Sequence, residues 1–151
     1  MPSHINRAEA IGAVSAAVGV LVAFLPWYSY PAGTGHITVN AFRASVLGDV
    51  FFLAIAAAIL LLLIGRGFVD DVVTPYIPES TAHAAAAALA MGTVLIQLIV
   101  ARSTGRALGA GIFLAVLAAA GLCTACVFRR LHPDRRRIVR DSLAQGSSIT
   151  P

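Results

Sequence analysis

The sequence predicts an all-α membrane protein, a bundle of four transmembrane helices with a short external β-hairpin between the first two. The first observation is composition: of 151 residues, 58% are hydrophobic and only 12% are charged, about half the charged share of a soluble domain. The second is four long apolar runs, Ala8–Leu25, Ala44–Ile64, Ala82–Ala101 and Leu108–Phe128. We therefore expect a transmembrane domain over 1–130 and an Arg-rich, partly disordered cytoplasmic tail over 131–151.

Each run has about the 20 residues that a helix needs to cross the hydrocarbon layer of a membrane. Helix is the expected conformation because lipid offers the backbone no hydrogen-bond partners. The residues between the runs are helix breakers: Pro26, Gly65, Gly67, Pro75 and Pro78. A signal peptide is the alternative for the first run, but its apolar core is too long and no Ala-x-Ala cleavage site follows it.

The distribution of arginine predicts the orientation. All eleven basic residues are Arg. In a four-span chain, the N-terminus, the 65–81 loop and the tail share one side and hold eight of them, while Arg43, Arg102 and Arg106 lie on the other side. Because loops on the cytoplasmic side are richer in basic residues, we expect both termini in the cytoplasm and the protein in the inner (plasma) membrane.

Six of these arginines follow the last run closely, which favours a role in membrane topology over nucleic-acid binding. We expect the first two to anchor the helix at the lipid headgroups. The other four would bind anionic phospholipids, at about 1 kcal/mol each, or an acidic cytoplasmic partner. The six are Arg129, Arg130, Arg135, Arg136, Arg137 and Arg140.

Three aromatic residues, Trp27, Tyr28 and Tyr30, follow the first run directly. Trp and Tyr favour the membrane–water boundary, where the ring is in an apolar layer and its polar atom is hydrated. We interpret the three as an interfacial aromatic belt. The stretches WYSY and HITV favour β-strands, and the PAGTG between them suits a tight turn. This pattern predicts the external hairpin.

The stretches FLPWYSY, TVNAFRAS and GDVFFLAIAAAILLLL, together with an internal loop containing Pro and a last helix ending in Arg, resemble a family of small, uncharacterised four-span membrane proteins of actinobacteria. That family has LPWYS after its first helix, a Thr-x-x-Ala-aromatic stretch and an Asp that opens its second helix. This chain has Phe42 where many members have Trp. The resemblance implies the four-span fold and no particular activity. The chain does not resemble claudins, because its first loop lacks their Trp-Leu-Trp and paired cysteines.

Asp49 is the most unusual residue of the second run, because a charge inside an apolar helix needs a partner, water or a proton. We expect it to pair with Arg102 and so to fix the second helix against the third. Gln97, one turn before Arg102, would join this network by hydrogen bonding. A transport or ion site at Asp49, or a short reach of its side chain to water, are the alternatives.

The chain has two cysteines, Cys123 and Cys126, in a C-x-x-C spacing. A redox pair is conceivable, but no second pair and no neighbouring His or acid accompany them. We therefore interpret them as small apolar packing residues. The histidines lie at the edges of the runs, which does not favour haem. We expect no cofactor, no metal and no catalytic residues, because no phosphate loop, nucleophile elbow, carboxylate pair or zinc spacing occurs.

Small residues recur at spacings of three or four in the first, third and fourth runs, which allows close helix packing. These stripes are Gly12, Ala16, Gly19 and Ala23; Ala84, Ala88 and Gly92; and Gly111, Ala115, Ala118 and Gly121. We interpret the protein as a non-catalytic accessory or assembly subunit of a larger inner-membrane complex, with other membrane subunits or further copies of itself as partners. The alternative is a small oligomeric transporter or channel that uses Asp49 and Gln97. A redox enzyme is a third hypothesis.

Overall fold

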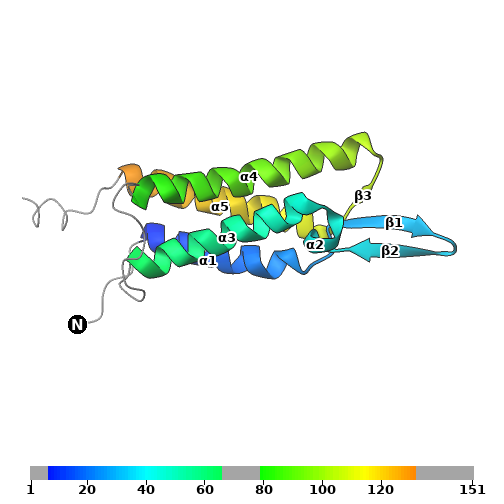
Figure 1. Ribbon diagram of the computed structural model, residues 1–151, viewed down its shortest axis with the longest axis horizontal. Helices are drawn as coiled ribbons and strands as arrows, with labels where there is room; N and C mark the ends of the chain where they lie inside the picture. Colours follow the sequence, from blue (N-terminus) through cyan, green and yellow to red (C-terminus); the bar gives the residue numbers. More distant parts are fainter. Residues whose placement is uncertain (1–6, 66–78, 132–151) are drawn as a thin grey trace, which may run out of the picture.

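A computed structural model of the chain describes residues 7–65 and 79–131. The tail predicted over 131–151, apart from its first residue, and most of the 65–81 loop lie outside these residues. The long helices run lengthwise along one bundle, and a hairpin projects from one of its ends (Figure 1). In chain order the described elements are α1 (Arg7–Ala23), β1 (Tyr28–Ala32), β2 (Gly35–Val39), α2 (Ala41–Ala44), α3 (Val46–Gly65), α4 (Glu79–Ser103), β3 (Ala107–Leu108) and α5 (Ala110–Leu131).

Three helices are long and apolar enough to cross a membrane, with candidate spans at Val46–Ile64, Ser80–Ser103 and Ala110–Leu131. They correspond to the second, third and fourth predicted runs. The first run forms α1, which has 17 residues and is not among these three. This helix ends at Ala23, two residues before the predicted run does. The backbone N–H groups of Phe24 and Leu25 donate to the carbonyl oxygens three residues before them, at 3.2 and 3.1 Å, which tightens the last turn before Pro26. The structure thus supports three of the four predicted spans.

Two of the helix starts differ from the predicted ones. Ala44, the first residue of the second run, ends the separate short helix α2, whose N-cap Asn40 accepts a hydrogen bond from the backbone N–H of Arg43 at 3.2 Å. Ser45 is then extended, and α3 starts only at Val46. The fourth run begins with strand β3 rather than a helix, so Leu108 pairs with a strand and α5 starts at Ala110.

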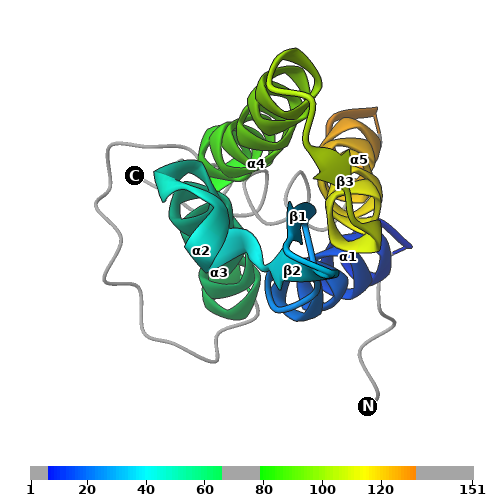
Figure 2. The same ribbon diagram turned by 90° about the vertical axis from the view of Figure 1, so that its right-hand side faces the viewer.

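The four long helices surround a common core (Figure 2), in which α1 packs on α3 and α5, and α4 packs on the same two helices. Small residues allow this closeness. A Cβ atom placed on Gly19 of α1 would lie 2.7 Å from Cδ1 of Ile55 on α3, and one on Gly12 would lie 3.5 Å from Cβ of Ala125 on α5. Close packing of small residues is the usual means of helix association in membranes.

The small-residue stripes are confirmed for two helices and wrong for the third. On α1, all four predicted residues are buried, and on α5 Gly111, Ala115 and Ala118 are buried. On α4, however, Ala88 is exposed. The buried face of α4 carries Ala87, Ala90 and Val94 instead. An Ala-rich helix has small residues on every side, so their spacing does not identify the inner face.

The predicted hairpin is present and belongs to a three-stranded sheet of order β2-β1-β3. Antiparallel pairing of Ala32 with Gly35 leaves a two-residue turn, Gly33-Thr34. Gly33 has a φ of 57°, which glycine adopts without steric cost and which suits the first turn position of a tight hairpin. Strands β1 and β2 extend beyond the helices at one end of the molecule (Figure 1).

Candidate functional site

Trp27 lies at the junction between the sheet and the bundle. Its indole Nε1 donates a hydrogen bond to the backbone oxygen of Val22 at 2.9 Å. Its ring meets Phe51 of α3 edge-on, with 5.3 Å between the ring centroids. Its backbone N–H donates to the carbonyl oxygen of Val39 at 2.8 Å. One residue thus connects α1, α3 and the sheet.

The start of α5 binds the backbone of the same segment. The N–H of Gly109 donates to the carbonyl oxygen of Trp27 at 2.8 Å, and that of Gly111 donates to the oxygen of Pro26 at 2.9 Å. These bonds satisfy N–H groups that the first turn of a helix otherwise leaves unpaired. A Cβ atom on Gly111 would lie 2.7 Å from both the Pro26 oxygen and Cδ1 of Trp27. The contact therefore requires glycine.

Tyr28 and Gln97 connect the sheet to α4. The hydroxyl of Tyr28 donates to Oε1 of Gln97 at 2.6 Å and lies 3.2 Å from the Gln97 backbone oxygen. Both residues are only 2% exposed. The amide Nε2 of Gln97 is buried and has no hydrogen-bond partner among the described residues. A buried amide with only one of its polar atoms paired is costly. The hydrogen bond from Tyr28 therefore contributes more to stability than a hydrogen bond on the protein surface would.

Arg106, in the loop after α4, covers the tyrosines. Its guanidinium carbon lies 5.8 Å from the ring centroid of Tyr28 and 5.5 Å from that of Tyr30, within cation–π distance of both rings. Burial raises the pKa of Tyr28, while the positive charge of Arg106 acts in the opposite direction. The Tyr28 hydroxyl therefore stays protonated over the physiological range and remains a donor to Gln97.

The structure corrects the interpretation of the three aromatic residues as an interfacial belt. Trp27 is 0% exposed, and Tyr28 is also buried, so neither ring faces the lipid headgroups. Tyr30 is half-buried beneath Arg106. The sequence could not reveal this, because Trp and Tyr occur both at membrane boundaries and in buried positions with a polar partner. The sequence held one signal of this packing, Gly109 and Gly111 at the start of the fourth run, because glycine allows another backbone segment to approach closely.

The structure does not bring Asp49, Arg102 and Gln97 together. Gln97 is buried and bonds to Tyr28, whereas Asp49 and Arg102 are both exposed. Within the described residues, no ion pair joins Asp49 to Arg102. The expected network is therefore wrong in this structure. The reason is the rotation of α3, which turns Phe51, Ile55 and Ala58 inward.

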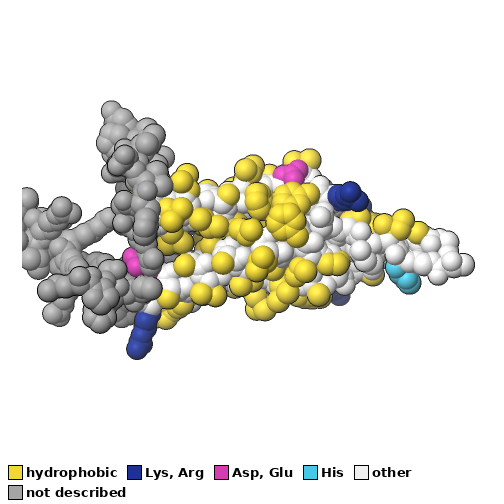
Figure 3. All heavy atoms as spheres, turned by 90° about the horizontal axis from the view of Figure 1, so that it is seen from below, with side chains coloured by type: hydrophobic (Ala, Val, Ile, Leu, Met, Phe, Trp, Pro, Cys, Tyr) yellow, Lys and Arg dark blue, Asp and Glu magenta, His cyan; other side chains and the backbone are white. Residues whose placement is uncertain are grey.

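Asp49 instead belongs to an outward-facing stripe of α3. The other members of this stripe, which we call the α3 outer stripe, are Val46, Leu53, Ala57 and Leu60. Val46 and Leu53 are 76% and 64% exposed. Hydrophobic side chains cover much of the helical part of the molecule, and basic side chains lie toward its two ends (Figure 3). Asp49, the fourth residue of α3, is the acidic exception on its stripe.

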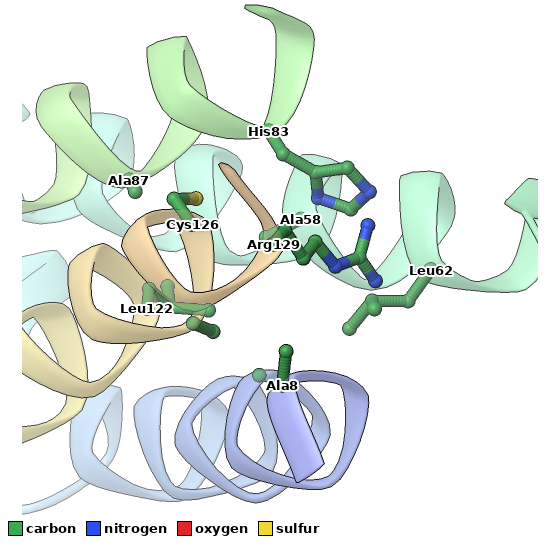
Figure 4. A pocket seen from close by; sticks show the side chains of 10 residues that line it. Ala8, Ala58, Leu62, His83, Ala87, Leu122, Cys126 and Arg129 are labelled. Carbon is green, nitrogen blue, oxygen red and sulfur yellow. The ribbon is translucent and has the colours of Figure 1, made fainter. Parts of the chain in front are cut away.

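A small pocket opens at the end of the bundle opposite the sheet. Figure 4 shows His83 of α4 and Arg129 of α5 converging on it, with Cys126 and Leu122 beside them. His83 is 6% exposed, and Arg129 is half-buried. The other walls are largely Ala and Gly from α1, α3 and α4. The described part of the chain holds no group of three His, Cys, Asp or Glu residues placed to bind a metal ion.

Neither cysteine is in a disulfide. Cys123 and Cys126 are free and half-buried, and the Cys123 thiol lies 3.7 Å from the backbone oxygen of Ala87 on α4. Of the predicted lipid-binding arginines, Arg129 and Arg130 end α5. The other four, between 135 and 140, lie outside the described residues.

Comparison with protein families, with curated proteins and with solved structures finds no match. The arguments for function therefore come from the geometry. It defines a helical bundle that is joined at one end to a small sheet by Trp27, Tyr28 and Gln97. Apart from Nε2 of Gln97, the polar and aromatic groups of these three residues are hydrogen-bonded or stacked within the protein. This arrangement fixes the sheet against the bundle. The α3 outer stripe differs from the other exposed apolar surfaces of the helices in carrying Asp49.

Proposed function

We propose that this protein is a non-catalytic integral membrane protein that acts as an accessory or assembly subunit of a larger inner-membrane complex. In this proposal α1 is the fourth span, because it packs lengthwise on α3 and α5. Both termini are then cytoplasmic and the sheet is external. The tail arginines contact anionic phospholipids.

The observation that carries the proposal is the position of Asp49. It is exposed on the α3 outer stripe among apolar side chains. At 1.5 Å per residue it lies about 4.5 Å along the helix from Val46. A carboxylate on a surface that faces lipid is unfavourable unless it has a partner, water or a proton, and a partner is the arrangement that we propose. Since the described residues provide no ion-pair partner, the complementary group comes from another chain, as a basic or hydrogen-bonding side chain of a neighbouring membrane helix.

The transporter alternative has one observation in its favour, the buried and unpaired Nε2 of Gln97. In a single copy, however, Gln97 faces the core of the bundle whereas Asp49 faces outward. The two side chains therefore do not line a common path within one molecule. A path shared between copies would require oligomers in which the outer stripe of one copy meets the interior of another.

The test is purification of the tagged protein from its native host in mild detergent, followed by native mass spectrometry. We expect a second membrane protein at a fixed ratio. Asp49→Asn should lower the assembled fraction about tenfold, the effect of losing roughly 1.4 kcal/mol of pairing energy. The isolated Asp49→Asn variant should melt close to the wild type, because Asp49 has no ion-pair partner among the described residues and its place in the first turn of α3 is worth at most about 1 kcal/mol.

Arg102→Gln is the matched control, since it removes another exposed charge at the same end of the bundle. It should leave both the assembled fraction and the melting temperature unchanged. A wild-type protein that runs only as a homo-oligomer would favour the transporter alternative. Equal assembly of wild type and Asp49→Asn would remove Asp49 from the proposal.

A further inference from the structure

The two edges of the external sheet are protected differently. The β1 side is covered by β3 at Tyr28 and Ser29, and beyond them it carries Pro31. Proline is a common protection of a sheet edge, because it lacks the N–H that a new strand would bind. Among the described residues, no strand covers the β2 side. Its sequence GHITV contains no proline and no lysine, and four of its five residues are exposed.

Pro31 also fixes the hydrogen-bonding direction of β2. Pro31 pairs with His36, and without an N–H it cannot exchange two hydrogen bonds with its partner. This pair is therefore a non-hydrogen-bonded pair, and bonded and non-bonded pairs alternate along an antiparallel ladder. The pair Ser29↔Thr38 lies two positions further along the ladder, so it is also a non-hydrogen-bonded pair. The backbone N–H and C=O groups of His36 and Thr38 thus point away from β1, toward the open edge.

The charged residue that follows β2 most closely along the chain is positive, and the next one, Asp49, lies on α3 rather than in the hairpin. Residues 24–48 contain no Asp or Glu. Arg43, which follows β2 closely, is exposed, and Arg106 lies over the ring of Tyr30 on β1. A strand added here meets basic side chains and a histidine. Electrostatic complementarity therefore favours an acidic segment.

A second copy in the same membrane fits this edge poorly. Strands β1 and β2 run in the direction of the helix axes (Figure 1), so the β2 strands of two copies with the same orientation point the same way. If a twofold axis along that direction related the two copies, each N–H group of one β2 strand would face the same N–H group of the other. Two donors cannot form a hydrogen bond with each other. The other edge of a neighbouring copy lacks a donor at Pro31.

We propose that the open edge of β2 binds an extended, acidic segment of a different protein by strand addition. The backbone groups of His36 and Thr38 form the new ladder, and the nearby arginines select the acidic side chains. The exposed Ile37, 58% accessible, provides an apolar contact on one face. This inference rests on the proposed function in one respect, that the protein assembles with another chain.

The experiment uses the full-length protein in its native host with the photoreactive substitution His36→p-benzoyl-phenylalanine. We expect an adduct with one other protein, mapped by mass spectrometry to a segment that contains several Asp or Glu residues. Thr38→Pro in the same chain removes the outward N–H but no bond to β1, and should lower the adduct yield about tenfold. Thr38→Val keeps that N–H and should leave the yield unchanged.

A second pair of variants covers the case in which Thr38→Pro disturbs the sheet. Thr38→Glu keeps the backbone donor but repels an acidic segment, so it should lower the yield, whereas Thr38→Lys should not. Adducts only with lipid, only with a second copy, or with a segment lacking acidic residues would overturn the inference. So would a yield that neither Thr38→Pro nor Thr38→Glu changes. If Asp49→Asn then still disrupts assembly, the proposed function stands without this edge.

Discussion

The hydroxyl of Tyr28 on β1 lies 2.6 Å from Oε1 of Gln97 on α4, so one hydrogen bond joins the sheet to the buried side of α4. Both side chains are buried, and the other amide atom of Gln97 has no hydrogen-bond partner among the described residues. The bond is therefore the main compensation for burying that amide.

Removing the Tyr28 hydroxyl should destabilise the protein. We expect Tyr28→Phe to lower the free energy of unfolding by about 1–3 kcal/mol, because it leaves the Gln97 oxygen buried and unpaired. Adding Gln97→Leu to Tyr28→Phe should restore part of the loss, because no polar group then remains unsatisfied. Melting temperatures in detergent measure both. Equal melting of Tyr28→Phe and wild type would show that this bond does not hold the sheet.

Gly111→Ala should destabilise the junction between α5 and the Pro26–Trp27 segment. The new methyl group would lie 2.7 Å from the Pro26 oxygen and the Trp27 ring, and such overpacking typically costs about 1–3 kcal/mol. Gly92→Ala is the matched control, since a Cβ at Gly92 of α4 has nothing within 4 Å. The control should melt at or above the wild-type temperature, because alanine favours helix. Similar melting of the two variants would contradict the close approach.

Stability should fall at alkaline pH through Tyr28. Burial raises the pKa of Tyr28 in the folded protein above its ordinary value, which is about 10. The folded state then binds more protons than the unfolded state as pH rises above that value, so stability is full below pH 10 and is lost as pH rises toward the folded pKa. Melting temperatures of the wild type and Tyr28→Phe between pH 9 and 11 test this. The variant should show a smaller decline, and parallel curves would exclude Tyr28 as the titrating group.

The double variant Cys123→Ser/Cys126→Ser should accumulate and assemble as the wild type does. Both thiols are free and half-buried in the described structure, and we interpret them as packing residues. Protein level by immunoblot and the assembled fraction by native mass spectrometry are the measurements. A cellular defect at unchanged protein level would favour the redox hypothesis.

Reporter fusions test the topology. We expect a reporter after Gly35, in the hairpin, to be external and one after Ser147, in the tail, to be cytoplasmic, because of the eight-to-three arginine distribution. A cytosol-active and an export-active reporter at each site give complementary signals. The same side for both fusions would rule out four spans.

The sequence by itself determined the local features of this protein. Apolar runs of sufficient length predict helices wherever they occur in lipid, and three of the four appear as helices able to cross a membrane. The WYSY and HITV stretches with Gly33 between them predict the hairpin, because turn chemistry is local. Small residues on α1 and α5 were likewise readable as close-packing faces.

For α3, α4 and the start of the sheet, the tertiary structure alone decided which side faces inward. A membrane helix is apolar both where it meets lipid and where it meets other helices, so its sequence carries little information on rotation. For this reason Asp49 could be predicted as an unusual residue but not as an outward-facing one. The same holds for Trp27 and Tyr28. Only the approach of α5 and α4, from far along the chain, encloses the two rings and gives Tyr28 its partner, Gln97.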